Sequence, residues 1–237
     1  MNGSILTRSA PEPPRTVAVG DDPDQVLELW PDGDAGRPLV ALVHGGFWRP
    51  RFDRAHLRPM AAALNALGLP VASVEYRRRP GHPDAAVADV LAGLRAAHAH
   101  AGPVVAVGHS AGGHLVLHAA AVEPSLLRAT VPLAPVADLA LADADDLGDG
   151  AVRAFLGTAA DDRPDLDPAA GPSPSGPVTI VHGDADDRVP LSVSRSYAGR
   201  HPSARLVELA GCDHFALVDP LSPAWTTVTR EILAAAA

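Results

Sequence analysis

Cysteine is almost absent from this chain, since Cys212 is the only one among its 237 residues. A single cysteine cannot form an internal disulfide, and the sequence contains no Cys-x-x-Cys pair and no cysteine and histidine cluster of the zinc-ribbon kind. These absences exclude a fold held together by disulfides or by a structural zinc ion of that kind. We therefore expect a reduced, cytoplasmic protein.

Long apolar segments are absent as well. No run reaches the roughly 18 apolar residues of a transmembrane helix. The first residues, MNGSILTRSAPEPPRT, lack the apolar core of about 7–15 residues that marks a secretory signal peptide. We therefore expect neither export nor insertion into a membrane.

Positive charge is in deficit, because 28 Asp and Glu residues face 19 Lys and Arg residues and the net charge is −9. Such a surface offers no positive field to attract phosphate backbones or anionic lipid head groups. We therefore expect no nucleic-acid partner and no membrane partner. A small, uncharged organic substrate is the more economical expectation.

What the chain does contain is 47% hydrophobic residues, arranged as short apolar runs that alternate with longer segments of helical spacing. The runs predict strands at 26–30, 39–43, 71–75, 104–107, 129–133, 178–181 and 205–209. The longer segments predict helices at 57–67, 84–100, 113–122, 191–200 and 223–235. This alternation predicts right-handed crossovers, and hence an α/β fold with a mainly parallel central sheet flanked by helices.

Three segments depart from this rhythm. Residues 1–16 are polar and rich in proline, so we expect a flexible, extended lead-in before a single domain at 17–237. No helix separates the first two predicted strands, which favours an antiparallel hairpin. Residues 136–176 are rich in Asp, Pro and Gly, and only AVRAFLG has helical spacing. We interpret that stretch as an excursion over one end of the sheet, either a solvated insertion or a partial cap.

Gly108, Ser110 and Gly112 form a Gly-x-Ser-x-Gly motif between an apolar strand that ends at Val107 and a predicted helix. Strand, sharp turn and helix are the setting of a nucleophile elbow, in which the backbones approach so closely that the residues flanking the serine must be small. The turn exposes the hydroxyl above a helix N-terminus, where negative charge is favoured. We interpret Ser110 as a nucleophile; the alternative is a glycine-rich turn with a bystander serine.

A serine hydroxyl needs a base to remove its proton and an acid to orient that base. His214 follows the last predicted strand in the sequence GCDHF, and we predict that it is the base. The acid is expected after the strand at 178–181, where HGDADDRVP offers Asp184, Asp186 and Asp187. The loop must carry the carboxylate some residues beyond the strand, which favours Asp186, with Asp187 as the alternative.

The sequence LVALVHGGFW is a predicted strand that runs into two glycines. Acyl transfer needs backbone N–H groups aimed at the developing oxyanion, and glycines allow the main chain to approach the substrate. We predict that the amides of Gly46, Phe47 and Ala111 form this oxyanion hole. Phe47 and Trp48 either line the substrate pocket or pack beneath it, and with His109 they are the candidate substrate-binding residues.

Two further clusters favour structural interpretations. His114 and His118 have a spacing that can bind a metal, but the segment lacks the glutamate of a zinc protease and a third ligand, so we expect no metal site. Arg77, Arg78 and Arg79 are interpreted as a solvated or carboxylate-paired turn rather than a phosphate site.

With these pieces in order, the chain resembles the α/β-hydrolase superfamily over roughly residues 25–235. Within it, the segments HGGFW, EYR, GHSAGGHL, HGDADDRVP and GCDHF resemble the arylformamidase (kynurenine formamidase) and esterase branch, where HGGxW replaces the HGGG of other esterases. The resemblance implies a catalytic triad of Ser110, Asp186 and His214, and an oxyanion hole formed by Gly46, Phe47 and Ala111.

The activity that this resemblance implies is two-step acyl transfer on a small ester or aryl formamide, with no metal and no organic cofactor. The same fold also serves peptidases, lyases, C–C hydrolases and non-catalytic binding proteins, which are the alternatives. The sequence leaves open whether the protein is a monomer or a homodimer.

Overall fold

The computed structural model describes residues 3–31, 33, 34 and 36–237. In this part of the chain an eight-stranded sheet has the order β1-β2-β4-β3-β5-β6-β7-β8. The strands are β1 (Arg15–Ala18), β2 (Val26–Trp30), β3 (Val40–Val43), β4 (Val71–Val74), β5 (Val104–His109), β6 (Leu127–Leu133), β7 (Thr179–Gly183) and β8 (Arg205–Leu209). All neighbours from β4 to β8 are parallel, so the expected mainly parallel α/β sheet is confirmed.

The predicted hairpin between the first two apolar runs is wrong. β2 pairs antiparallel with β1 on one side and with β4 on the other, while β3 lies between β4 and β5. Every residue of β3 is buried, whereas two of the five residues of β2 are partly exposed. The run that is apolar at each position therefore takes the centre of the sheet, where helices cover both faces.

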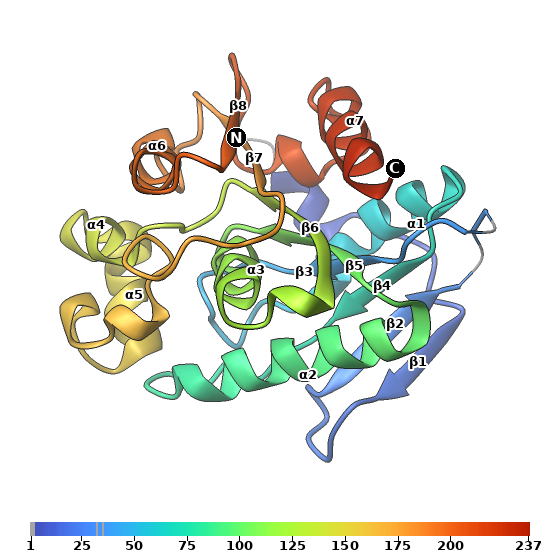
Figure 1. Ribbon diagram of the computed structural model, residues 1–237, viewed down its shortest axis with the longest axis horizontal. Coiled ribbons are helices and arrows are strands. Elements are labelled where there is room, and N and C mark those ends of the chain that lie inside the picture. The colour runs from blue at the N-terminus through green and yellow to red at the C-terminus, as the bar shows by residue number, and fades with distance from the viewer. Residues whose placement is uncertain (1–2, 32, 35) are drawn as a thin grey trace.

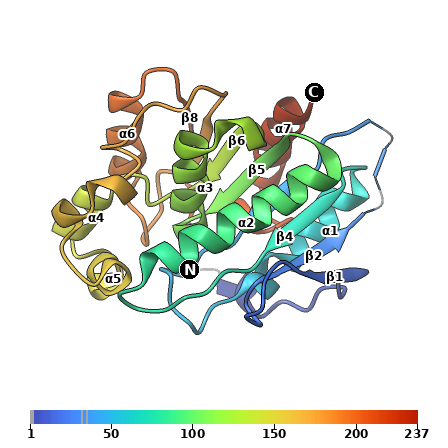
Figure 2. The ribbon, with the colours of Figure 1, turned by 60° about the horizontal axis from the view of Figure 1, so that its bottom comes forward.

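Helices cover both faces of the sheet (Figures 1 and 2). Their bounds are α1 (Arg58–Ala66), α2 (Pro83–Ala101), α3 (Ala111–Val122), α4 (Leu139–Ala144), α5 (Leu147–Leu156), α6 (Leu191–Arg200) and α7 (Trp225–Ala236). Short 3₁₀ segments span Gly3–Thr7, Arg54–Leu57, Pro124–Leu126, Ala160–Asp162, Pro164–Leu166 and Ala216–Val218. None of the described helices is both long enough and apolar enough to cross a membrane.

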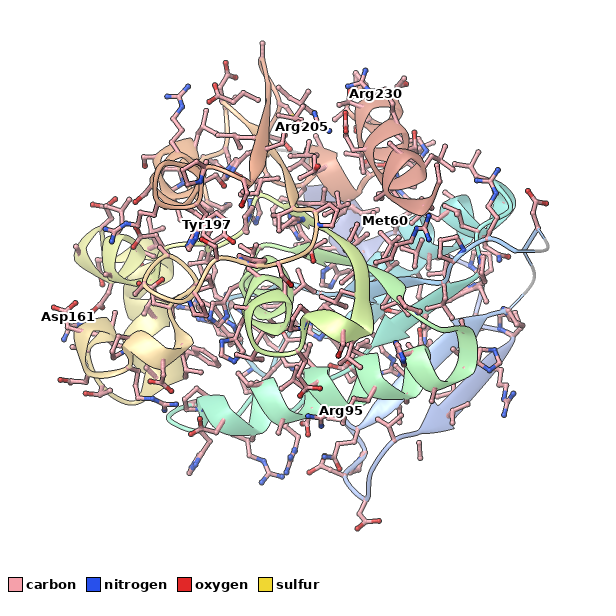
Figure 3. All side chains as sticks on the ribbon, in the orientation of Figure 1. Met60, Arg95, Asp161, Tyr197, Arg205 and Arg230 are labelled. Carbon is pink, nitrogen blue, oxygen red and sulfur yellow. The ribbon has the colours of Figure 1, made fainter. Side chains whose placement is uncertain are left out.

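The strand side chains divide the core into two clusters. In β3, Ala41 and Val43 join the cluster beneath α2, α3 and α6, while Val40 and Leu42 join the cluster beneath α1 and α7. This is the alternation expected of a strand with helices on both sides. At the far edge of the sheet, Arg205 of β8 pairs with Glu231 of α7 and so ties this helix to the last strand, while Arg230, also in α7, pairs with the same carboxylate. Figure 3 labels both arginines.

The excursion at 136–176 is more helical than expected. The segment AVRAFLG lies largely within α5, as its spacing predicts. The sequence pattern did not predict α4. Asp138 caps α4 by accepting a hydrogen bond from the Leu141 amide at 2.8 Å. Asp167 accepts from the amides of Leu139 and Ala169, each at 3.0 Å, and so joins the two ends of the excursion. In Figures 1 and 2 the segment lies beside α3.

The N-terminal segment also differs from the expected extended lead-in. Residues 3–7 form a 3₁₀ turn, and Ile5 is fully buried in the cluster beneath α1 and α7. The Arg8 guanidinium pairs with Asp219, with one N–O distance of 2.7 Å. The expected boundary after residue 16 falls inside β1. A single apolar residue such as Ile5 creates no periodic pattern in the sequence, so its burial could not be predicted. Residues 1 and 2 lie outside the described residues.

Replacing Ile5 by alanine tests this anchoring of the N-terminal segment. Because the side chain is fully buried, Ile5→Ala should lower the free energy of unfolding by about 2 kcal/mol. Leu221, which is 80% exposed, gives the matched control, and Leu221→Ala should change the value by less than about 0.5 kcal/mol. Urea denaturation measures both. Equal, negligible effects would contradict the anchoring.

Candidate active site

Ser110 occupies a sharp turn between β5 and α3. Its backbone has φ 56° and ψ −117°, a conformation that non-glycine residues rarely adopt and that costs about 1–3 kcal/mol. Main-chain hydrogen bonds hold it there: the Ser110 amide donates to the Leu133 carbonyl at 2.9 Å, and the Ser110 carbonyl accepts from His114 and Val136 at 3.1 and 3.2 Å. The strain is therefore sustained by the adjacent strand and helix.

Glycines make this turn sterically possible. A Cβ atom on Gly108 would collide with the Gly112 carbonyl, and one on Gly112 would collide with the Val43 carbonyl. A Cβ atom on Gly45 would lie 2.9 Å from that of Ser110. The expectation that small residues must flank the serine is thus confirmed, and the loop after β3 lies directly against Ser110.

His214 and Asp186 form a close pair. Nδ1 of His214 lies 2.6 Å from Oδ2 of Asp186, and their side chains are 4% and 0% exposed. The other carboxylate oxygen of Asp186 accepts the amides of Arg188 and Val189, both at 2.8 Å. The loop after β7 therefore wraps around the carboxylate and fixes its direction toward His214.

The surroundings of Asp186 favour its charged form. Burial by itself would raise the pKa of this carboxyl, but hydrogen bonds from His182 and His214, the positive charge of His214 when protonated, and the Val189 amide together hold the pKa well below its usual range. An ionised carboxylate only accepts hydrogen bonds, so Nδ1 of His214 carries the proton of the neutral ring. Nε2 of His214 is then available as an acceptor.

The neighbouring aspartates have other contacts. The Asp187 side chain is 54% exposed and lies 3.4 Å from the Arg188 guanidinium. Asp184 accepts the Gly211 amide at 2.6 Å and joins the loops that follow β7 and β8. Of the three candidates for the acid, Asp186 is the one whose carboxylate reaches His214.

Ser110 and His214 line the same cavity, which has a volume of about 690 Å³. Gly46, Phe47 and His109 also line it. Among the hydrogen bonds of the described residues, none joins the Ser110 hydroxyl to His214. Such bonds often form fully only when a substrate is bound, and a rotation of the serine side chain about its Cα–Cβ bond changes the position of its Oγ atom.

The amides expected to form an oxyanion hole lie around Ser110. Gly46 and Phe47 follow β3 with φ values of 110° and 52°, and Ala111 is the first residue of α3. The first amides of a helix have no acceptor within the helix. In the described part of the chain, the amides of Gly46, Phe47 and Ala111 donate no hydrogen bond to another residue. All three are thus free to bind an external oxygen.

The three candidate substrate-binding residues have different positions. Phe47 and His109 line the cavity. Trp48 does not: it is 3% exposed and stacks on Phe155 of α5, with ring centroids 4.4 Å apart. Of the two alternatives for Trp48, this position agrees with packing beneath the pocket. Phe47 and Trp48 both have left-handed backbones, and their side chains diverge, one to the cavity and the other to the core.

His109 supports the loop of His214. Its Nε2 lies 3.0 Å from the His214 carbonyl, and the two imidazole centroids are 4.5 Å apart. Burial, with the positive field of His214, lowers the pKa of His109 well below its usual range, so the ring is neutral. It therefore donates one hydrogen bond, to the main chain of His214.

A buried polar network supports the loop after β3. Nε2 of His44 lies 2.8 Å from Glu75, and the Tyr76 hydroxyl donates to the His44 carbonyl at 3.0 Å. Burial, aided by the nearby Arg78, lowers the pKa of His44 to about 3. Glu75 also accepts the amide and the guanidinium of Arg54 at 3.1 and 3.0 Å. Glu75 and Tyr76 were not predicted as site residues, although they belong to the EYR segment.

The other clusters have structural roles. Arg77 pairs with Asp89 at 2.7 Å, Arg78 with Glu75, and Arg79 with Asp22 at 2.7 Å, which confirms a carboxylate-paired turn. His114 binds the Leu166 carbonyl through Nε2 at 2.8 Å and so ties α3 to the excursion. In the residues that the structure describes, no three His, Cys, Asp or Glu side chains are grouped to hold a metal ion.

A family model described as the alpha/beta hydrolase fold matches residues 40–170, more than half of the chain. The chain belongs to the α/β hydrolase fold family. The match includes β3, the turn at Ser110 and most of the excursion. No curated protein matches this α/β hydrolase.

Solved structures share the fold of this α/β hydrolase at low sequence identity. A thioesterase, described as putative, from Silicibacter sp. TM1040 is 24% identical, with a TM-score of 0.74 over 91% of this chain and 86% of that chain. Thermogutta terrifontis esterase 2 is 22% identical, with a TM-score of 0.74 over 94% and 96%. An acetyl ester-xyloside bifunctional hydrolase from Caldicellulosiruptor lactoaceticus is 18% identical, with a TM-score of 0.75 over 93% and 95%.

Proposed function

We propose that this α/β hydrolase is a serine hydrolase that cleaves a small carboxylic ester or an aryl formamide through an acyl-enzyme intermediate. One observation carries the proposal: His214, whose Nδ1 lies 2.6 Å from the buried Asp186 carboxylate, lines the same cavity as Ser110. This is the set of groups that acyl transfer requires, namely a nucleophile, a base and an oriented acid.

The first step is attack on the carbonyl. Nε2 of His214 takes the proton from the Ser110 hydroxyl as Oγ bonds to the carbonyl carbon, and the carbonyl π electrons move onto oxygen. The amides of Gly46, Phe47 and Ala111 stabilise the oxyanion. His214 then protonates the departing alcohol or amine as its bond to carbon breaks, which leaves an acyl group on Ser110.

The second step is hydrolysis of the acyl group. His214 takes a proton from water as the water oxygen attacks the acyl carbon, and it returns that proton to Ser110 as the ester bond breaks. The carboxylic acid leaves and the enzyme is regenerated. Asp186 remains ionised throughout and stabilises the imidazolium that forms in each half-reaction.

The cavity supports a small substrate. Its volume of about 690 Å³ suits a small organic molecule, and Phe47, Phe52 and Phe215 provide apolar lining. Structures of Thermogutta terrifontis esterase 2 with propionate and butyrate bound, at TM-scores of 0.71 and 0.72, support a short acyl chain. The aromatic lining supports an aryl leaving group, such as that of an aryl formamide, because aromatic rings pack against one another.

A fluorophosphonate probe and p-nitrophenyl acetate test the role of Ser110. The wild type should be labelled and should hydrolyse the ester, whereas Ser110→Ala should lose labelling and at least about 1000-fold in kcat. Ser192, an exposed serine of α6, gives a matched control, and Ser192→Ala should behave as the wild type.

Equal labelling of wild type and Ser110→Ala, or labelling of neither, would refute the serine mechanism. Formanilide assayed beside the ester tests the narrower proposal. Turnover of the ester without turnover of formanilide would remove formamide hydrolysis from it.

The two adjacent aspartates provide a test of the acid. Asp186→Asn leaves His214 without a carboxylate to fix its tautomer, so kcat for p-nitrophenyl acetate should fall by about 10³–10⁴-fold. Asp187→Asn changes an exposed side chain and should alter kcat by less than about 3-fold. Circular dichroism should show both variants folded. A larger loss of kcat from Asp187→Asn than from Asp186→Asn would show that Asp187, and not Asp186, is the acid.

A further inference from the structure

The proposed oxyanion loop has an unusual backbone. Phe47 and Trp48 are consecutive non-glycine residues in the left-handed region, with φ values of 52° and 53°. Side chains disfavour this conformation because Cβ approaches the following carbonyl oxygen. Such strain persists only where surrounding contacts impose it. Because the Phe47 amide is a proposed oxyanion donor, these contacts also set the direction of that donor.

The contacts on Phe47 come from the excursion. A Cβ atom built on Gly148 would lie 2.9–3.0 Å from the Phe47 ring, so the ring rests directly on the Gly148 backbone. The Arg49 guanidinium donates to the Gly148 carbonyl and lies 5.9 Å from the centroid of the Phe47 ring. Gly148 and Arg49 therefore confine the same aromatic ring.

Trp48 is held by a different part of the same excursion. It stacks on Phe155 with an interplanar angle of 13°, and its ring meets His114 of α3 edge-on, with centroids 5.3 Å apart. His114 in turn binds the Leu166 carbonyl. Both left-handed residues thus pack against the excursion, Phe47 at the cavity and Trp48 in the core.

Gly148, which meets Phe47, is the first residue of a left-handed turn within α5. Gly148, Asp149 and Gly150 have φ values of 63°, 55° and 70°. Glycine at two of the three positions lowers the strain of this turn. At position 148 the contact with Phe47 also requires glycine. At position 150 no contact does, because a Cβ atom on Gly150 would meet nothing closer than 3.6 Å.

We infer that the turn at 148–150 is a positioning device for the oxyanion hole. Gly148 packs against the Phe47 ring, and the hydrogen bond from Arg49 to the Gly148 carbonyl holds the oxyanion loop against the turn. These contacts fix the direction of the Phe47 N–H group before substrate binds. This inference rests on the proposed hydrolase function. It makes Gly148 and Arg49 positioning residues, and it gives the excursion the role of a fixed buttress rather than a movable lid.

The two glycines of the turn provide a matched experiment. Both have positive φ, so Gly148→Ala and Gly150→Ala impose the same kind of backbone strain, but only the first forces a methyl group against Phe47. With uncharged p-nitrophenyl acetate, Gly148→Ala should lower kcat by about 10–100-fold and leave KM within about 3-fold. Gly150→Ala should retain kcat within about 3-fold and lose a similar amount of thermal stability.

Arg49 gives a second, independent readout. Arg49→Ala should lower kcat by about 10-fold at unchanged KM, because the loop loses its fastening to Gly148. Arg49→Lys keeps a charged donor for the Gly148 carbonyl and should restore part of that loss. The substrate carries no charge, so these effects do not report ion pairing with substrate.

The outcomes separate the inference from the proposed function. If the wild type neither hydrolyses the ester nor labels at Ser110, the hydrolase function itself fails. If the wild type is active but Gly148→Ala and Gly150→Ala have equal kcat, or if Gly148→Ala and Arg49→Ala raise only KM, the positioning role is overturned. If Gly148→Ala does not fold, the Arg49 pair decides, and equal kcat in wild type, Arg49→Ala and Arg49→Lys overturns the inference.

Discussion

The site depends on one steric constraint, the close approach of three backbone segments at Ser110. β5 and α3 meet at a residue with φ 56°, and the loop after β3 lies so near that Gly45, Gly108 and Gly112 have no room for a side chain. This approach places the loop of Gly45 and Gly46 beside the turn that carries Ser110. A central parallel sheet makes it possible, because β3 and β5 are neighbours and both end at this edge.

Electrostatic preorganisation completes the site. The carboxylate of Asp186 is buried yet charged, because main-chain amides and two histidines satisfy it. The amides of Gly46, Phe47 and Ala111, which we propose as the oxyanion donors, have no internal acceptor in the described structure, so no hydrogen bond must break before they bind an oxyanion. The network of His44, Glu75 and Tyr76 supports the loop after β3 where it leaves the strand. Further along the loop, the hydrogen bond from Arg49 to the Gly148 carbonyl joins it to the excursion.

Local patterns predicted the features that depend on local chemistry. Continuous apolar runs identified the central strands, and the glycines around Ser110 identified the turn. Long-range packing decided what could not be predicted. The pairing of β2 with β4, the burial of Ile5 and the turn of Trp48 into the core depend on segments distant in sequence. The choice between Asp186 and Asp187 depends on the path of one loop, which sequence spacing favours but does not fix.

The central claim is that Ser110 lies beneath preformed oxyanion donors. A crystal structure of the enzyme after reaction with a short alkyl fluorophosphonate tests it most directly, because the adduct resembles the tetrahedral intermediate. The account predicts phosphorus bonded to Oγ of Ser110, with its terminal oxygen about 2.7–3.1 Å from the amide of Ala111 and from that of Gly46 or Phe47. An adduct on another residue, or a terminal oxygen directed away from these amides, would contradict the account.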